Sequence, residues 1–340
     1  MKSKIGIGII GVGYWGPNLV RNFMEIEECD LLWVCDLSRD RLDYISGMFP
    51  GVGVTQDYGD ILGDARVDAV VVATPVETHF EVAKAVLAAG KHAFIEKPMT
   101  ARADEGLELV RMAEKARLKM GTGHIFLYHP AVVKMKEVLR RGKVGDLCYC
   151  HSTRMNPSPS HGNVDVVWDL AVHDISIALY LWGKIPVRVR ADGRKFMHGD
   201  RFDAAMLELH FLDGSIAYHH VGWLTSAKER CFFLAGKNGS MRFDDMGDEK
   251  LKIVGPAVDT RLDASAQKGH ICYAPGEIAV PHLPPAEPLK KECLAFLQSI
   301  MLGQPMVSDG AFGQGVVQVL EAVSHSLKRD GEMVALERTA

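Results

Sequence analysis

The sequence lacks the features that mark secreted and membrane-spanning proteins. Its seven cysteines are an odd number without a C-x-x-C spacing, so we interpret them as reduced, mostly buried thiols rather than a disulfide framework. It has no uninterrupted run of about 18 apolar residues. The apolar segment near the N-terminus is too short for a secretory signal. These absences predict a cytoplasmic protein without a membrane partner.

Charge of one sign and metal-binding spacings are also scarce. Lys and Arg total 39 against 43 Asp and Glu, a formal net charge of -4, so the basic footprint of a nucleic-acid-binding protein is missing. None of the 14 histidines stands in an H-x-x-x-H or H-E-x-x-H arrangement. The adjacent His219 and His220 would point to opposite faces of a strand. We therefore expect a small-molecule partner, no nucleic acid and no metal site.

The first third of the chain alternates short apolar runs with helical patterns. Helices are predicted over residues 78–89 and 103–119, and strands at residues 5–10, 31–35, 69–73 and 93–95. Strands and helices that alternate in this way build a parallel sheet with crossover helices. The prediction is an α/β fold whose first domain, residues 1–123, is a doubly wound parallel sheet of the Rossmann type.

From residue 147 the pattern changes to longer strands with hairpin turns such as Asp213-Gly214. Strand candidates cover residues 147–155, 187–196, 204–211, 215–223, 230–235 and 240–243. One helix is predicted over 164–182, and two closing helices over 289–302 and 309–328. The pattern predicts a C-terminal α+β domain, residues 124–340, with a large, mostly antiparallel open sheet.

A glycine-rich segment, Gly11-Val12-Gly13-Tyr14-Trp15-Gly16, follows the first strand and precedes a helical run. In this context Gly11 makes the tight turn, Gly13 lets a pyrophosphate approach the backbone, and Gly16 allows close helix packing. Asp36 ends the second strand, where an acid can bind the ribose hydroxyls of NAD. Arg39 could instead pair with the 2′-phosphate of NADP. The pattern predicts a dinucleotide site that favours NAD, with NADP as the alternative.

Two further strand ends carry polar residues at the same carboxyl edge, where open α/β sheets bind ligands. Thr74-Pro75 follows the third strand, and Glu96-Lys97-Pro98 follows the fourth. Lys97 is placed to contact a substrate oxygen, although a lysine in a loop is more often a surface residue.

The helix over 164–182 is mostly apolar and carries Asp169 and His173 at positions i and i+4. These side chains would share one helix face, so the carboxylate could orient an imidazole that exchanges a proton. By spacing alone, a capped or salt-bridged structural pair is the more common interpretation. Arg154 and Asn156 end a strand before the 157–162 loop, a candidate lid whose polar groups could bind a substrate.

A series of short motifs runs through nearly the whole chain. They include the glycine segment, Glu96-Lys97-Pro98, Gly123-His124 with His129-Pro130, Trp168 to Asp174, and Trp223-Leu224. Together they resemble the Gfo/Idh/MocA oxidoreductases, although Ala171 stands where relatives commonly have glycine. The Gly-Tyr-Trp-Gly-Pro-Asn run at 13–18 is similar to the branch that handles nucleotide-linked or amino sugars.

The resemblance implies an NAD(P)-dependent dehydrogenase or reductase that acts on a CH-OH group of a sugar-type substrate. It implies that Lys97, Asp169 and His173 are catalytic. The predicted substrate-binding residues are Lys97, Arg154, Asn156, Asp169 and His173. The predicted cofactor-binding residues are Gly11, Gly13, Tyr14, Trp15, Gly16, Asp36, Leu37, Arg39, Thr74, Pro75, His79, Glu96 and Lys97.

Alternatives remain within and outside this enzyme class. A catalytically silent NAD(P)-sensing protein on the same fold would need only the dinucleotide half, and an inositol-type cyclitol dehydrogenase or an enzyme that keeps its cofactor bound would share these motifs. The open sheet, with few helices to cover it, also predicts a homodimer or homotetramer.

Overall fold

The structure is a computed structural model that describes residues 4–157, 164–256 and 276–336. The chain divides into two compact units. The first comprises Met1–Tyr128 with Ala286–Gln318, and the second comprises His129–Pro285 with Val319–Ala340. This division differs from the predicted domains 1–123 and 124–340, because part of the predicted closing segment belongs to the first unit. Most of the predicted lid, residues 158–162, lies outside the described residues.

The first unit is built on a six-stranded sheet in the order β3-β2-β1-β4-β5-β6. Every neighbouring pair is parallel. The strands are β1 (Ile5–Ile10), β2 (Cys29–Cys35), β3 (Gly53–Thr55), β4 (Ala69–Val72), β5 (His92–Ile95) and β6 (Met120–Thr122). The order reverses between β1 and β4, so their carboxyl ends form the switch point where doubly wound sheets bind ligands. The predicted Rossmann-type sheet is confirmed.

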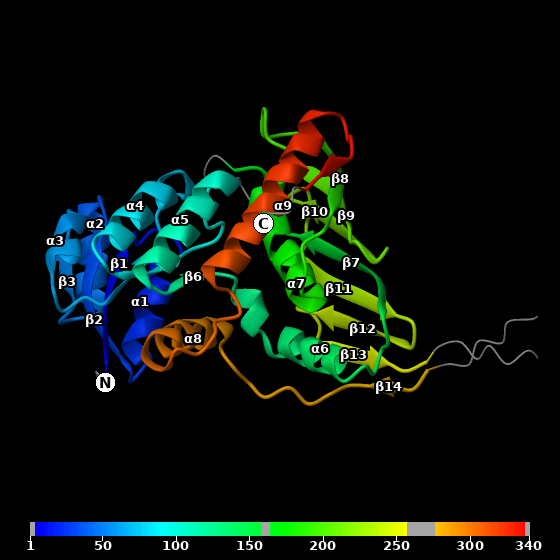
Figure 1. Cartoon of the computed structure of the whole chain (residues 1–340), viewed down its shortest axis with the longest axis horizontal. Coiled ribbons are helices and arrows are strands. Elements are labelled where there is room, and N and C mark those ends of the chain that lie inside the picture. Colours follow the sequence, from blue (N-terminus) through cyan, green and yellow to red (C-terminus); the bar gives the residue numbers. More distant parts are fainter. Residues whose placement is uncertain (1–3, 158–163, 257–275, 337–340) are drawn as a thin grey trace, which may run out of the picture. The chain divides into compact units, whose positions relative to one another are not determined.

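Helices cover both faces of this sheet. They are α1 (Gly16–Glu25), α2 (Arg39–Met48), α3 (Tyr58–Gly63), α4 (Val76–Ala88), α5 (Ala103–Ala116), the 3₁₀ helix η1 (Ile125–Tyr128), α8 (Pro288–Leu302) and the first part of α9 (Gly310–Lys328). Figure 1 shows α4 and α5 on one side of the sheet and α1 and α8 on the other. Because both faces are covered, every residue of β1 and β4 is buried.

The position of α8 explains why the first unit includes a segment from near the C-terminus. Phe296 of α8 packs against Phe94 of β5, with ring centroids 5.4 Å apart. Glu287, just before α8, accepts hydrogen bonds from Arg21 and Asn22 of α1. The helix therefore packs on the parallel sheet at β5 and lies against α1 and η1.

The second unit contains a nine-stranded sheet in the order β14-β13-β12-β11-β7-β10-β9-β8-β15. Its strands are β7 (Leu147–Met155), β8 (Arg188–Arg194), β9 (Ala204–His210), β10 (Ile216–Gly222), β11 (Glu229–Gly236), β12 (Gly239–Asp244), β13 (Leu251–Val254), β14 (Ile278–Ala279) and β15 (Val334–Ala335). All neighbours are antiparallel except β7 and β10. The predicted large, mostly antiparallel sheet is confirmed.

Side chains alternate between a buried and an open face of this second sheet. Helix α6 (Pro130–Arg140) and helix α7 (Val172–Trp182) lie on one side of it (Figure 1). The residues that face them, such as Leu207, Ala217 and Phe232, are buried. On the opposite face Met206 is 60% exposed and Tyr218 is 42% exposed. This face presents apolar surface to its surroundings.

Candidate functional site

The glycine turn between β1 and α1 has the geometry expected of a dinucleotide site. Gly11 has φ +94°, and a Cβ there would lie 2.6 Å from the Ala73 carbonyl oxygen. A Cβ on Gly16 would lie 2.9 Å from the Gly11 carbonyl oxygen. Both positions therefore require glycine for the turn itself.

Gly13 differs, because the protein leaves space around it. A Cβ on Gly13 would approach only the Arg41 Nη1 atom, at 3.8 Å. The first turn of α1 has neither a side-chain cap nor an acidic residue among the described residues. Open space over a glycine beside uncapped helical N–H groups fits a bound pyrophosphate.

Asp36 holds the same turn from β2. Its side chain is buried, and it accepts hydrogen bonds from the N–H of Val12 at 2.8 Å and of Ser38 at 2.9 Å. One Asp36 oxygen also lies 3.5 Å from Arg41 Nη1. Asp36 thus joins the glycine turn to the start of α2, as well as placing a negative charge at the predicted ribose position.

The basic residue at this position is Arg41, which the sequence reasoning missed. The predicted Arg39 donates instead to Asp43 at 3.0 Å, and both of these side chains are largely exposed. Two residues along a helix turn by about 200°, so Arg39 and Arg41 face different directions. The sequence signal for Arg41 is its position in the first turn of the helix that follows Asp36.

Large apolar side chains flank this turn. Tyr14 is 90% exposed, Leu37 is 87% exposed, and Trp15 is partly exposed. The Trp15 side chain also approaches Glu96, which follows β5, and lowers the pKa of that carboxyl group. Exposed apolar groups at the carboxyl edge of the sheet are suited to contact the flat rings of a dinucleotide.

His79 ties two strand ends together. Its Nε2 lies 2.8 Å from the Thr74 carbonyl oxygen, and its Nδ1 lies 2.9 Å from the Pro98 carbonyl oxygen. The ring is buried, and burial lowers its pKa. The structure therefore places His79 beside the predicted cofactor-binding residues Thr74 and Pro75, as a bridge between the segments after β4 and β5.

Glu96 and Lys97 follow β5 at the same edge. The Lys97 N–H donates to Glu96 Oε2 at 3.1 Å, and the Lys97–Pro98 peptide is cis. Burial raises the pKa of Glu96 to about 7, against the opposing effects of the Lys97 N–H and charge. A Cβ on Gly123 would lie 2.7 Å from Glu96 Oε2, which explains the glycine there.

A second buried carboxyl, Glu292 of α8, was missed by the sequence reasoning. It is fully buried, and burial and the charge of Glu96 raise its pKa well above the usual value. His124 is also buried, and burial together with the Lys97 charge lowers its pKa to about 3. These shifts favour the neutral form of both side chains. The only sequence signal was an acid on the apolar side of a closing helix.

In the second unit, the predicted helix 164–182 contains an unexpected π-helix. The π-helix η2 (Val167–Ala171) precedes α7, and the Val172 N–H bonds to the Val167 carbonyl five residues back. The expectation of α-helical spacing between Asp169 and His173 is therefore corrected, because the two residues lie on either side of this junction. Both are partly exposed among buried neighbours.

Trp223 fixes the Asp169 carboxylate. Its indole N–H donates to Asp169 Oδ2 at 3.0 Å, and Trp223 is buried just after β10. The His173 carbonyl oxygen accepts a hydrogen bond from Ser176 at 2.7 Å. Of the three predicted catalytic residues, Lys97 belongs to the first unit, whereas Asp169 and His173 belong to the second.

Arg154 does not occupy the solvent-facing position expected of a substrate-binding residue. It lies on the buried face of β7 and makes a two-pronged ion pair with Asp174 of α7. The predicted role is corrected by strand alternation, because Arg154 shares a face with the buried Cys150 and Ser152. Asn156 is two residues further on, and its backbone N–H donates to the Gly222 carbonyl oxygen at 3.1 Å.

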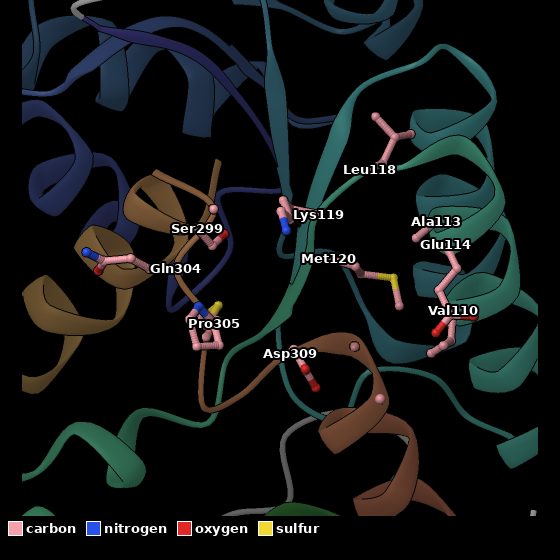
Figure 2. Close-up of a pocket in the computed structure, with 14 residues that line it drawn as sticks. Val110, Ala113, Glu114, Leu118, Lys119, Met120, Ser299, Gln304, Pro305 and Asp309 are labelled. Atoms are coloured by element: carbon pink, nitrogen blue, oxygen red, sulfur yellow. The ribbon is translucent and has the colours of Figure 1, made fainter. Parts of the chain in front are cut away.

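A pocket of about 310 Å³ opens elsewhere in the first unit. Figure 2 shows Val110 and Glu114 from α5, Met120 from β6, and Asp309 before α9 around it. None of the predicted cofactor-binding or catalytic residues lines this pocket.

Across the described ranges no helix is long and apolar enough to cross a membrane. In the same ranges no group of three or more His, Cys, Asp or Glu side chains could hold a metal ion.

The raised pKa of Glu292 predicts how stability depends on pH. The unfolded chain releases the Glu292 proton near its ordinary pKa of about 4.3, whereas the folded chain keeps it to higher pH. The wild-type protein therefore loses stability as pH rises through this window, by about 1.4 kcal/mol per pH unit from this group. Glu292→Gln carries no such proton.

We expect the Glu292→Gln variant to gain stability relative to wild type as the pH rises above the unfolded-state pKa of about 4.3 towards the raised folded-state pKa. Urea unfolding of both proteins at several pH values measures the difference in the free energy of unfolding. Glu96 titrates in both proteins, so its contribution largely cancels. A difference that does not change with pH would show that Glu292 is ionised in the folded protein.

Comparisons with known proteins agree with this fold. Residues 5–124 match the model of the oxidoreductase family with an NAD-binding Rossmann fold, and residues 132–242 match the GFO/IDH/MocA C-terminal domain. UDP-N-acetylglucosamine 3-dehydrogenase of Acidithiobacillus ferrooxidans is 33% identical over 216 residues, which cover 62% of this chain and 64% of that protein. Myo-inositol 2-dehydrogenase of Thermotoga maritima is 29% identical over 224 residues, covering 62% and 66%.

Solved structures extend the likeness over almost the whole chain. The Acidithiobacillus ferrooxidans enzyme superposes with a TM-score of 0.83 at 26% identity, covering 96% of this chain and 99% of that one. GenD2 from gentamicin A biosynthesis, solved in complex with NAD, superposes with a TM-score of 0.83 at 23% identity, covering 99% and 97%. This chain belongs to the Gfo/Idh/MocA family of oxidoreductases and carries that family's NAD-binding Rossmann domain.

Proposed function

We propose that this oxidoreductase transfers a hydride between NAD and a ring carbon of a nucleotide-linked amino sugar. The main support is its similarity, in sequence and in fold, to a UDP-N-acetylglucosamine 3-dehydrogenase. The chain aligns with less than two thirds of that relative's sequence, so the substrate is part of the proposal. A cyclitol is the second candidate, because inositol 2-dehydrogenases are also among the relatives.

The first unit supplies the cofactor site. The glycine turn and the N-terminus of α1 would hold the pyrophosphate, and Asp36 would accept hydrogen bonds from the ribose hydroxyls. Bound NAD supplies the hydride acceptor for a carbinol carbon. Lys97, after β5, contacts the carbinol oxygen and stabilises the negative charge that develops on it.

The second unit supplies the proton acceptor. When a carbinol becomes a carbonyl, a hydride leaves its carbon and a proton leaves its oxygen, and His173 takes that proton. In the reverse reaction His173 returns it. Asp169, which Trp223 holds, stabilises the protonated imidazole by its negative charge. A silent NAD-sensing protein would have no need for these three residues.

Substitution of the proposed catalytic residues should reduce turnover without weakening NAD binding. Removal of a positioned acid-base group costs about 10²- to 10⁴-fold in rate, so His173→Ala and Lys97→Ala should each lose at least about two decades in kcat. Asp169→Asn should lose less, because the amide keeps the shape but not the charge. Steady-state kinetics with UDP-N-acetylglucosamine and with myo-inositol, and calorimetry with NAD, measure both effects.

The exposed His325 of α9 offers a matched control, since it lies in the same unit and outside the proposed site. His325→Ala should keep wild-type kcat. Near wild-type turnover of His173→Ala on the true substrate would instead mean that Asp169 and His173 are structural. Activity on myo-inositol alone would replace the amino-sugar proposal with the cyclitol one.

Cofactor preference should depend on Asp36 and Arg41 rather than on Arg39. Asp36→Ala removes the charge that repels a 2′-phosphate, so the ratio of NADP to NAD affinity should rise by about tenfold or more. A tenfold change in this ratio corresponds to about 1.4 kcal/mol in the difference between the two binding free energies. Arg41→Ala should weaken NADP binding. Arg39→Ala is the control and should change neither, because Arg39 is paired with Asp43. Calorimetric titration measures each affinity, and tighter binding of NADP by wild type would contradict the preference for NAD.

The open face of the second sheet supports a homodimer or homotetramer. Phe233 of β11 stacks on His151 of β7 with centroids 4.9 Å apart, and Tyr149 extends this aromatic group. Phe233→Glu should therefore lower the molecular mass measured by light scattering at micromolar concentration. Tyr44→Glu, on the exposed side of α2, should leave it unchanged. A monomeric wild-type protein would contradict this assembly.

A further inference from the structure

A buried ion pair joins a strand to the helix that carries His173. Arg154 Nε lies 2.9 Å from Asp174 Oδ2, and Arg154 Nη2 lies 2.9 Å from Asp174 Oδ1. The two side chains are only 4% and 2% exposed. Two parallel charge-assisted hydrogen bonds fix both the distance and the relative orientation of the two groups.

Stability alone does not account for such a pair. Removing two charges from water costs about as much as their attraction returns, and apolar side chains of similar size are often as stabilising at such positions. What the pair supplies is a defined geometry. That geometry acts on the residue next to Asp174 in the chain, which is His173.

The backbone at this point needs an external constraint. His173 lies in the first turn of α7, directly after the π-helix η2, and α7 has no side-chain cap among the described residues. A π-helical turn is wider than an α-helical one and sets the rotation of the helix that follows it. Asp174 is held against the sheet, so His173 is directed to the partly exposed side of the helix.

Asp169 is anchored to the same end of the sheet. Arg154 of β7 is in register with Val221 of β10, and Trp223, which bonds Asp169, follows two residues later. Two neighbouring parallel strands therefore each provide one side chain. One holds Asp169 on the π-helical side of the junction, and the other holds the residue after His173.

We propose that the Arg154–Asp174 pair is a positioning element that sets the orientation of the His173 imidazole toward Asp169 and the substrate. Arg154 and Asp174 act through His173 and touch no substrate. The inference rests on the proposed role of His173 as the proton acceptor.

The charged surroundings of the pair allow a clean pH measurement. The titratable groups near Asp174 on the sheet are His219 and Cys150. Burial lowers the pKa of His219 to about 4 and raises that of Cys150 well above its usual value. Both are neutral between about pH 5 and pH 8, where imidazoles commonly titrate. Glu96, whose pKa burial raises to about 7, belongs to the first unit and is present in wild type and variant alike. A shift of the profile relative to wild type is therefore assigned to His173.

The main test replaces both charges at once, in the Arg154→Met/Asp174→Leu variant. Neither partner is left as an unpaired buried charge, so the urea midpoint should stay near the wild-type value or rise. We expect kcat with UDP-N-acetylglucosamine to fall about tenfold or more, NAD affinity to stay unchanged, and the pH midpoint of kcat/KM to shift. The matched control is Lys237→Met/Asp146→Leu, which removes an exposed ion pair of the same unit and should change none of these.

Arg154→Lys decides the outcome if the double variant does not fold. Lysine keeps the charge but cannot make the two-pronged contact, so kcat should fall and the pH midpoint should move while NAD binding is kept. Wild-type kcat and pH profile in the folded double variant or in Arg154→Lys would overturn the proposal, as would an activity loss that matches the fraction unfolded. His173→Ala separates the two hypotheses: full activity of that variant refutes the proposed catalytic role, whereas an inactive His173→Ala beside a fully active pair variant refutes only the positioning role.

Discussion

The buried carboxylates of Asp36 and Asp174 each hold, within their own unit, the segment that carries proposed site residues. Asp36 accepts the N–H groups of Val12 and Ser38, so the glycine turn and the start of α2 close around one acid. Asp174 takes both prongs of the Arg154 guanidinium and so attaches α7 to β7. A buried carboxylate without partners is costly. The backbone around each acid must therefore adopt the conformation that supplies its donors, and that conformation also places the neighbouring site residues.

Much of the fold could be predicted because its strands are long, apolar and bounded by turn residues. The buried runs of β1 and β4 and the Asp213-Gly214 turn between β9 and β10 carry their signal locally. The three-residue β3 and the six-residue α3 are too short for any periodicity to identify. The π-helix depends on one displaced backbone hydrogen bond, and the place of α8 in the first unit depends on packing against Phe94. Neither has a local signature in the sequence.

The site shows the same division between local and long-range signals. Gly11 and Gly16 could be predicted because the turn itself excludes a side chain there. A basic residue next to a loop favours a substrate-binding role for Arg154. Its alternation with Cys150 and Ser152 along β7 instead predicts an inward side chain, which then requires an acid. Asp174, the one acid in the apolar stretch of α7, was the matching signal.

Burial shifts the pKa values of several titratable groups near Lys97. Burial and the Lys97 charge lower the pKa of His124 to about 3, and burial with the Glu96 charge raises the pKa of Glu292 well above its usual value. Glu96, with a pKa raised to about 7, changes its ionisation near neutral pH. When Glu96 is ionised, its charge attracts the neighbouring Lys97 ammonium, and when it is protonated, this attraction is lost. Burial behind the strand ends thus places beside Lys97 a carboxyl group whose charge depends on pH near neutrality.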